Sequence, residues 1–169
     1  ELAIVISQSG ETADTLACLH HLKAEGRRTL AIVNRAESSI AREADAVIIT
    51  AAGPEIGVAA TKTFTAQLAV LFCFAIGLAR SRNMIEAAGE ADLLSALAAV
   101  PEKMRRLFAN NNAILRSAAL LNTAHDAIYL GRGTNYPLAL EGALKLKEIS
   151  YVHAEGFAAG EMKHGPIAL

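Results

Sequence analysis

The chain has 169 residues, of which 53% are hydrophobic and 20% are charged, and its formal net charge is −1. This length and apolar content can fill a core and suggest one domain or parts of two, which excludes a disordered chain. The balanced charge provides no basic field and no acidic tail, so we expect no direct binding to nucleic acid.

The cysteines and the apolar runs indicate a cytoplasmic protein. Cys18 and Cys73 lie in apolar helical patterns without the spacing of metal ligands or of a redox pair, so we expect buried free thiols. The longest apolar run, 68–79, has twelve residues, which is short for a membrane span and typical of a core helix. No signal peptide is visible ahead of the first strand.

The first twelve residues predict a strand, a tight loop and a helix. An apolar run at 2–6 ends in Ser-Gln-Ser-Gly-Glu-Thr at 7–12, and apolar residues at helical spacing follow. The first N–H groups of a helix are unpaired and favour an anion. Further neutral donors that suit a phosphate are the hydroxyl groups of Ser7, Ser9 and Thr12 and the side-chain amide of Gln8. The alternative is that Ser9 or Thr12 merely caps the helix.

The alternation of strand and helix continues to residue 84. Apolar runs at 29–33 and 46–50 predict two further strands, with a short helix at 38–44 between them. Such strands, without polar alternation, indicate a doubly wound α/β fold with a parallel sheet covered on both faces. The Gly- and Pro-containing loop 51–62 then precedes a long apolar helix. Such a loop is either a ligand contact or an ordinary connection.

Helices without strands are predicted for the next part of the chain, and a strand, a Gly-containing loop and a helix then repeat the opening plan. We therefore expect a first unit at 1–84, a helical connector at 85–122 and the beginning of a second unit at 123–169.

The helix that begins near residue 138 carries a charged stripe. Glu141, Lys145 and Glu148 share one face, beside an apolar stripe of Leu140, Leu144 and Tyr151. One interpretation is a surface ladder of ion pairs. The other is a carboxylate and an ammonium that move protons between adjacent carbons of a sugar. No zinc pattern is predicted, because His153 and His164 are far apart and have few partners.

Four parts of the sequence together resemble the isomerase region of the glutamine–fructose-6-phosphate aminotransferase family. They are 7–12, 53–62, 131–150, and 153–155 with 163–166. The first loop type occurs across the wider sugar isomerase (SIS) domain family, whereas the segment 140–151 followed by His-Ala-Glu is more specific. The resemblance runs along the whole chain and implies a flavodoxin-like fold of two incomplete SIS units joined by helices.

The resemblance also implies the residues that bind the substrate. The sugar phosphate would be held by Ser7, Gln8, Ser9 and Thr12. Val58 and its loop would face the sugar. Ala60 stands where the family has Ser, which puts one hydroxyl contact to the sugar in doubt.

The catalytic residues are implied in the same way. Glu148 would be the base that shuttles hydrogen between C1 and C2, with Lys145 and Glu141 beside it. His164 would assist ring opening and reach the site of the neighbouring subunit in a homodimer. No metal or other cofactor is implied, and the family's Schiff-base lysine is expected beyond this chain.

The implied function is the sugar-phosphate isomerase core of an amidotransferase. It would make glucosamine 6-phosphate from fructose 6-phosphate and ammonia, which a separate glutaminase domain releases from glutamine. The alternatives are an amino-sugar-phosphate deaminase or isomerase, or a phosphosugar-binding module without activity. Such a module does not need Glu148, Lys145 and His164, so their joint presence favours the enzyme. We expect a fragment that exposes apolar sheet faces, dissolves poorly and is inactive alone.

Overall fold

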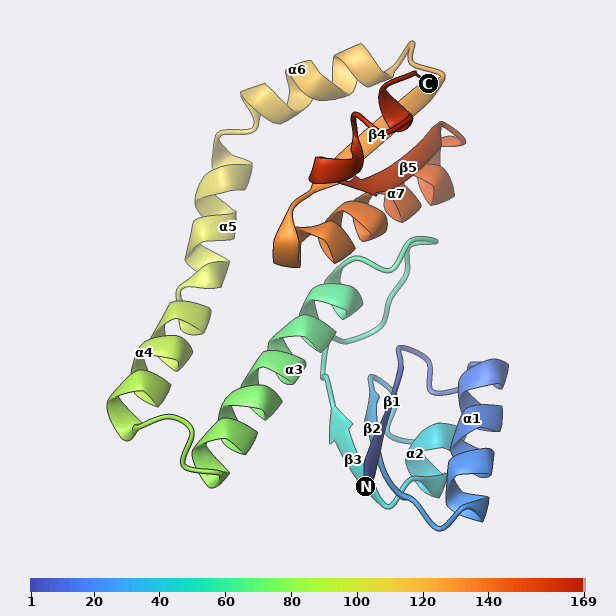
Figure 1. Ribbon diagram of the computed structural model, residues 1–169, viewed down its shortest axis with the longest axis vertical. Helices are drawn as coiled ribbons and strands as arrows, with labels where there is room; N and C mark the ends of the chain where they lie inside the picture. Colours follow the sequence, from blue (N-terminus) through green and yellow to red (C-terminus); the bar gives the residue numbers. More distant parts are fainter. Residues whose placement is uncertain (169) are drawn as a thin grey trace. The chain divides into compact units, whose positions relative to one another are not determined.

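The structure, a computed structural model, describes residues 1–168. They divide into two compact units (Figure 1). The first contains Glu1–Ile56 and Ala60–Val100, and the second contains the remaining described residues.

The first unit is built on a parallel sheet with strand order β1-β2-β3, which confirms the predicted α/β pattern. The connections between successive strands contain helices, as parallel pairing requires. In chain order its elements are β1 (Leu2–Ser7), α1 (Ala13–Ala24), β2 (Arg28–Val33), α2 (Ser39–Glu43), β3 (Ala46–Ile49), α3 (Lys62–Ser81) and α4 (Ala87–Ala98).

Helices α1 and α2 cover one face of this sheet. Val5, Ala31 and Val33 point to that face, because side chains in a strand alternate between the two sides. They pack against Leu19 of α1 and Ile40 of α2, and all five side chains are buried. This core fixes the carboxyl ends of β1 and β2, where the loops begin.

The opposite face is covered less completely than the sequence pattern predicts. Ile48 of β3 lines a shallow hollow with Phe74 of α3, so this helix lies beside that face. Leu2, Ile4 and Ile6 of β1 nevertheless remain 40–53% exposed. A helix is about 10 Å wide and strands lie about 4.8 Å apart, so one helix beside β3 cannot cover β1 as well. The expected exposure of apolar sheet surface is confirmed.

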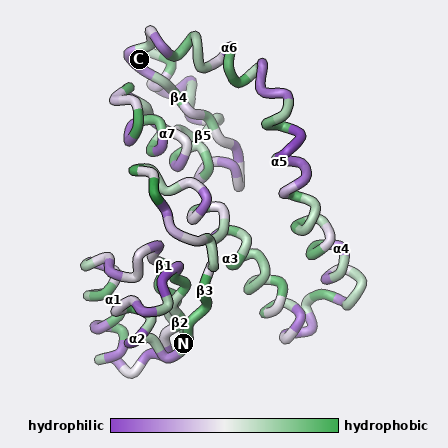
Figure 2. The backbone as a smooth tube through the Cα atoms, turned by 180° about the vertical axis from the view of Figure 1, so that it is seen from behind, coloured by the Kyte–Doolittle hydropathy of each residue, from purple (hydrophilic) through white to green (hydrophobic). Residues whose placement is uncertain are grey.

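Helix α3 confirms the predicted long helix, but its predicted burial is not seen. Within the described residues it buries only Thr63 and Ile76. Figure 2 shows hydrophobic positions along much of its length. By length and composition alone it could cross a membrane, although a core helix of a soluble protein passes the same test. The absence of a membrane span therefore stays a prediction.

Both cysteines are free, as expected, but the prediction that they are buried is wrong. Cys18 and Cys73 are exposed. Cys18 precedes Leu19, the residue of α1 that points into the core, and therefore lies away from that core. Cys73 lies on the largely uncovered α3. An apolar neighbourhood in the sequence did not determine which side of each helix is covered.

The second unit has a two-stranded parallel sheet, β4-β5, as predicted for a second incomplete unit. Helix α7 packs against both strands. The close approach requires Gly156 of β5, because a Cβ there would lie 2.9 Å from the backbone of Leu140. The elements are α5 (Val100–Ala109), α6 (Asn112–Leu121), β4 (Asp126–Gly131), α7 (Tyr136–Ser150) and β5 (His153–Ala158), with short 3₁₀ turns at Gly133–Asn135, Ala159–Glu161 and Pro166–Ala168.

Two expectations about the helices have different outcomes. The stretch 83–122 forms the helices α4, α5 and α6, and no strand is assigned in it, as predicted. The apolar stripe on α7 does not extend to Tyr151, however. That residue follows the helix end in a left-handed conformation (φ 59°), and its side chain is exposed.

Candidate active site

The loop between β1 and α1, residues 7–12, is held by its own hydroxyl groups. The Oγ of Ser7 lies 2.8 Å from Thr12 Oγ1 and accepts a hydrogen bond from the N–H of Gly10 at 3.0 Å. The Oγ of Ser9 accepts from the N–H of Glu11 at 3.1 Å. The predicted phosphate residues therefore form one compact turn at the carboxyl end of β1.

Neither candidate hydroxyl caps α1. Thr12 directly precedes the helix, but its side chain makes no capping hydrogen bond. Ser9 is bonded to Glu11, which lies outside the helix. The first N–H groups of a helix have no partner within it. Those of α1 are therefore left for an external acceptor, such as a phosphate oxygen.

The bonding pattern also leaves hydroxyl protons for a ligand. A hydroxyl carries one proton and can accept two hydrogen bonds. Ser9 uses its oxygen as an acceptor, so its proton is available. When Ser7 donates to Thr12, the proton of Thr12 is available as well. In that arrangement two neutral donors lie beside the first turn of the helix.

Contacts with the beginning of α2 fix the shape of this loop. Gly10 has φ 67°, and a Cβ there would lie 2.0 Å from Ser38 Oγ. Its carbonyl oxygen accepts from the N–H of Ile40 at 3.1 Å. The carboxylate of Glu11 accepts from the N–H of Ser39 at 2.8 Å, and this bond lowers the pKa of Glu11. The loop and the first turn of α2 therefore form one body.

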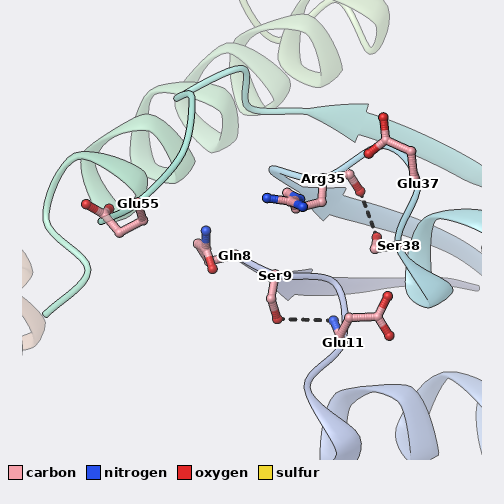
Figure 3. Close-up of a pocket in the computed structure, with 7 residues that line it drawn as sticks. All are labelled: Gln8, Ser9, Glu11, Arg35, Glu37, Ser38 and Glu55. Atoms are coloured by element: carbon pink, nitrogen blue, oxygen red, sulfur yellow. Dashed lines mark hydrogen bonds between the residues drawn. The ribbon is translucent and has the colours of Figure 1, made fainter. Parts of the chain in front are cut away.

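A hollow of about 380 Å³ opens beside the loop (Figure 3). It is lined by Gln8, Ser9, Glu11, Arg35, Glu37, Ser38 and Glu55. Three carboxylates against one guanidinium disfavour a phosphate dianion in its centre. An anion would instead be held by the loop and by the first turn of α1. Arg35 was not among the predicted site residues, although its place just after β2, at the same sheet edge as the loop, is a signal that could have found it.

The loop after β3 is anchored where α3 begins. The carboxylate of Glu55 accepts from the N–H of Thr63 at 3.2 Å and from its Oγ1 at 2.7 Å. The bond from the Thr63 hydroxyl is the main cause that lowers the pKa of Glu55. Of the two residues predicted to face the sugar, Val58 is 91% exposed and Ala60 is half-buried.

Three predicted catalytic residues meet on α7, in the second unit. The Nζ of Lys145 lies 2.7 Å from Glu148 Oε2 and 3.4 Å from Glu141 Oε1. The hydrogen bond to Glu148 is the main cause that raises the pKa of Lys145. Lys145 therefore stays an ammonium at neutral pH and holds both carboxylates.

This triplet differs from an ordinary surface ladder elsewhere in the chain. On α5, Glu102 pairs with Arg105 and Arg106, and these side chains are 52%, 72% and 78% exposed. Glu141, Lys145 and Glu148 are 25%, 22% and 33% exposed. The cluster on α7 is thus partly withdrawn from water, which strengthens its electrostatic interactions.

The histidines of the second unit lie in different settings. His164 is exposed, and its backbone N–H donates to the carbonyl of Glu161 at 2.9 Å. No hydrogen bond or ion pair within residues 1–168 joins it to the α7 triplet. His153 pairs with Asp126 at 2.8 Å and with Glu155 at 3.3 Å. No cluster of three metal-ligating side chains occurs in the described part of the chain.

Comparisons with known proteins agree with this architecture. The SIS domain family matches residues 1–77 and 120–169. The glutamine–fructose-6-phosphate aminotransferase of Zymomonas mobilis is 55% identical over 168 residues, 99% of this chain but 28% of its own length. That of Bradyrhizobium diazoefficiens is 56% identical over 169 residues, again 28% of its length. The chain thus spans less than a third of these curated relatives.

A solved structure is similar along the same stretch. It is the C-terminal domain of glucosamine-fructose-6-phosphate aminotransferase from Francisella tularensis, with a TM-score of 0.95 and 42% identity. The match covers 99% of this chain and 48% of that one.

Proposed function

Because the chain belongs to the SIS domain family, we propose that it is the sugar-phosphate isomerase core of a glutamine–fructose-6-phosphate aminotransferase. The full protein would make glucosamine 6-phosphate from fructose 6-phosphate and ammonia. Its glutaminase domain would release that ammonia from glutamine. The proposal rests on high identity along almost the whole chain to proteins that carry this name.

The structural observation that carries the proposal is the triplet on α7, whose side chains are less exposed than those of the α5 ladder. Lys145 lies between two carboxylates that are less than 35% exposed, unlike the surface ladder on α5. A shuttle of hydrogen between C1 and C2 needs a carboxylate held in place to take and return the proton. Glu148 would be this base. The ammonium of Lys145 would orient it, with Glu141 as the second anchor of that ammonium.

The phosphate would be bound by the loop of the first unit. Ser9 and Thr12 would donate their hydroxyl protons to it, and the open N–H groups of α1 would add backbone donors. Ser7 would shape the turn, and Gln8 would contribute its side-chain amide. Val58 and Ala60 would lie on the sugar side.

The assembly and location of the protein are further parts of the proposal. We propose a homodimer in which His164 assists ring opening in the site of the neighbouring subunit. We propose a cytoplasmic location, in keeping with the free cysteines.

The test replaces Glu148 by Gln in the full-length enzyme, which keeps the size of the side chain and removes the basic carboxylate. Exchange of the C1 or C2 hydrogen of fructose 6-phosphate with solvent deuterium should fall at least 100-fold, the range that loss of a general base produces. Affinity for the sugar phosphate should stay within about twofold, because the phosphate anchor is intact. Glu102→Gln, the same change in a surface ladder, is the control and should leave exchange at the wild-type rate.

The possible results separate the proposed functions. Wild-type exchange in Glu148→Gln would return this residue to a surface role. Tight binding of fructose 6-phosphate without any hydrogen exchange in the wild-type enzyme would indicate a binding module without activity. Formation of fructose 6-phosphate from glucosamine 6-phosphate, with no reaction in the direction of synthesis, would indicate a deaminase.

A further inference from the structure

The side chain of Asn34, the first residue after β2, links the carboxyl end of β2 to the segment that follows β3. Its Oδ1 accepts from Thr50 Oγ1 at 3.0 Å and from the N–H of Ala52 at 2.9 Å. Its Nδ2 donates to the carbonyl oxygen of Gly53 at 2.7 Å. This single amide therefore uses both of its acceptor positions, and one of its two donors, on the segment that leaves β3.

The segment that Asn34 holds has an unusual backbone. Ala51 has φ 52° and Gly53 has φ 72°. A positive φ is uncommon for a residue with a side chain and persists where the surroundings enforce it. The three bonds from Asn34 fall on both sides of Ala51, at Thr50, Ala52 and Gly53. These three bonds therefore hold Ala51 at its positive φ.

The same segment is tied down again a few residues later. Glu55 accepts two hydrogen bonds from Thr63 at the beginning of α3. The two anchors together define the course of residues 50–55. Residues 50–55 lead directly into the part of the loop that contains Val58 and Ala60.

The link from Asn34 to residues 7–12, named the phosphate loop after its proposed ligand, is of a different kind. It is a bond of 3.2 Å from the backbone N–H of Asn34 to the carbonyl oxygen of Gln8. A change of the Asn34 side chain leaves this backbone bond in place. The side chain therefore acts on one of the two loops alone.

We infer that Asn34 is a positioning residue that shapes the sugar side of the site and leaves the phosphate side unaffected. The inference rests on the proposed function, because it takes the loop after β3 to face the sugar. Loss of the amide would let Ala51 relax to a negative φ and redirect the loop. The reacting carbons would then be misplaced while the phosphate stays bound, and small misplacements reduce turnover strongly.

The experiment measures fructose 6-phosphate turnover by the full-length enzyme and inhibition by inorganic phosphate as a probe of the phosphate loop. Asn34→Ala should lower kcat at least tenfold and change the inhibition constant of phosphate by less than twofold. Asn34→Asp keeps the two acceptor bonds and loses the donor, so its kcat should be intermediate. Thr50→Val removes one of the three bonds and should cause a smaller loss.

Two controls calibrate these effects. Ser9→Ala should show the reverse pattern, with a phosphate inhibition constant at least tenfold higher. Asn122→Ala, at the end of α6, changes an asparagine outside both loops and should match the wild-type enzyme.

The outcomes separate this inference from the proposed function. Unchanged kcat in Asn34→Ala, or parallel loss of turnover and phosphate inhibition, would overturn the positioning role. If Asn34→Ala does not fold, the same criteria apply to Thr50→Val. A wild-type enzyme that neither binds nor converts fructose 6-phosphate would instead overturn the proposed function itself.

Discussion

The hydroxyl groups of the phosphate loop have divided tasks. Ser7 accepts the N–H of Gly10 and lies next to Thr12, so it shapes the turn. The hydroxyl proton of Ser9 is free for a ligand, that of Thr12 is free when Ser7 donates to it, and the side chain of Thr12 does not cap α1. Sequence spacing alone left capping and ligand binding open, and the bonding pattern favours ligand binding.

The first prediction concerns these two hydroxyls. Ser9→Ala and Thr12→Val in the full-length enzyme should each raise KM for fructose 6-phosphate. A lost hydrogen bond to a charged group costs about 1.5–3 kcal/mol, or roughly tenfold to 150-fold in affinity. Steady-state kinetics measures the change. Ser117→Ala, which removes an exposed hydroxyl on α6, is the control, and unchanged KM in both loop variants would refute the assignment.

Individual residues were predictable where chemistry lies within one short segment. Ser7, Ser9 and Thr12 stand together in the sequence, and so do the residues of the α7 triplet. Asn34 and Arg35 were missed because their roles depend on backbone and side-chain groups from other loops. These groups lie near Asn34 and Arg35 only because the parallel sheet places the carboxyl ends of its three strands at one edge.

At the scale of the elements, two titratable side chains form a hydrogen bond between the first residues of β4 and β5. Asp126 and His153 are register partners at the first position of the two strands. Their side chains lie 2.8 Å apart, and Glu155 lies 3.3 Å from the other ring nitrogen. The hydrogen bond to Asp126 is the main cause that raises the pKa of His153.

This raised pKa predicts how stability depends on pH. The protonated ring stabilises the folded state, so its contribution is complete below the unfolded pKa of about 6.5 and is lost as the pH rises through the higher folded value. The Tm of the wild-type 169-residue chain should therefore fall more between acidic and mildly alkaline pH than the Tm of the His153→Gln variant. Thermal unfolding of both chains at several pH values measures this. Asp126→Asn should reduce this loss as well. An identical pH dependence in wild type and His153→Gln would contradict the role.

Elements were easier to predict than their coverage. Apolar runs and helical spacing predicted the three strands of the first unit and their parallel order. The exposure of Cys18 and the turn at Tyr151 were not predictable in the same way. Burial depends on which helix packs on which face. A left-handed residue after a helix gives no signal when the residue is Tyr rather than Gly or Asn.

At the scale of the whole chain, the uncovered surface of the sheet should govern behaviour in solution. Leu2, Ile4 and Ile6 form an exposed apolar strip along β1. We expect the purified 169-residue chain to self-associate, because burial of this strip between copies removes apolar surface from water. Sedimentation at several concentrations should show association that the double change Ile4→Gln and Ile6→Gln weakens. A monomer at every concentration would contradict this expectation.

The same preparation tests catalytic completeness. Incubated with fructose 6-phosphate and glutamine, it should form no glucosamine 6-phosphate, because the proposed function assigns the release of ammonia to a separate glutaminase domain. An assay for amino-sugar phosphate measures this. Turnover close to that of a full-length enzyme would show that the chain is complete for the reaction.

The close packing of Gly10 against the first turn of α2 links the shape of the loop to the folding of the whole unit. Beyond the loop's own hydroxyl bonds, the phosphate loop is held by contacts with Ser38, Ser39 and Ile40, about thirty residues later in the chain. A peptide of the first strand, loop and helix could keep the loop's own hydroxyl bonds but would lack these contacts with α2. We therefore expect full binding competence only once β2 and α2 are in place. Under the proposed function, a bound phosphosugar would therefore stabilise the unit as a whole, and the gain would grow with ligand concentration by mass action.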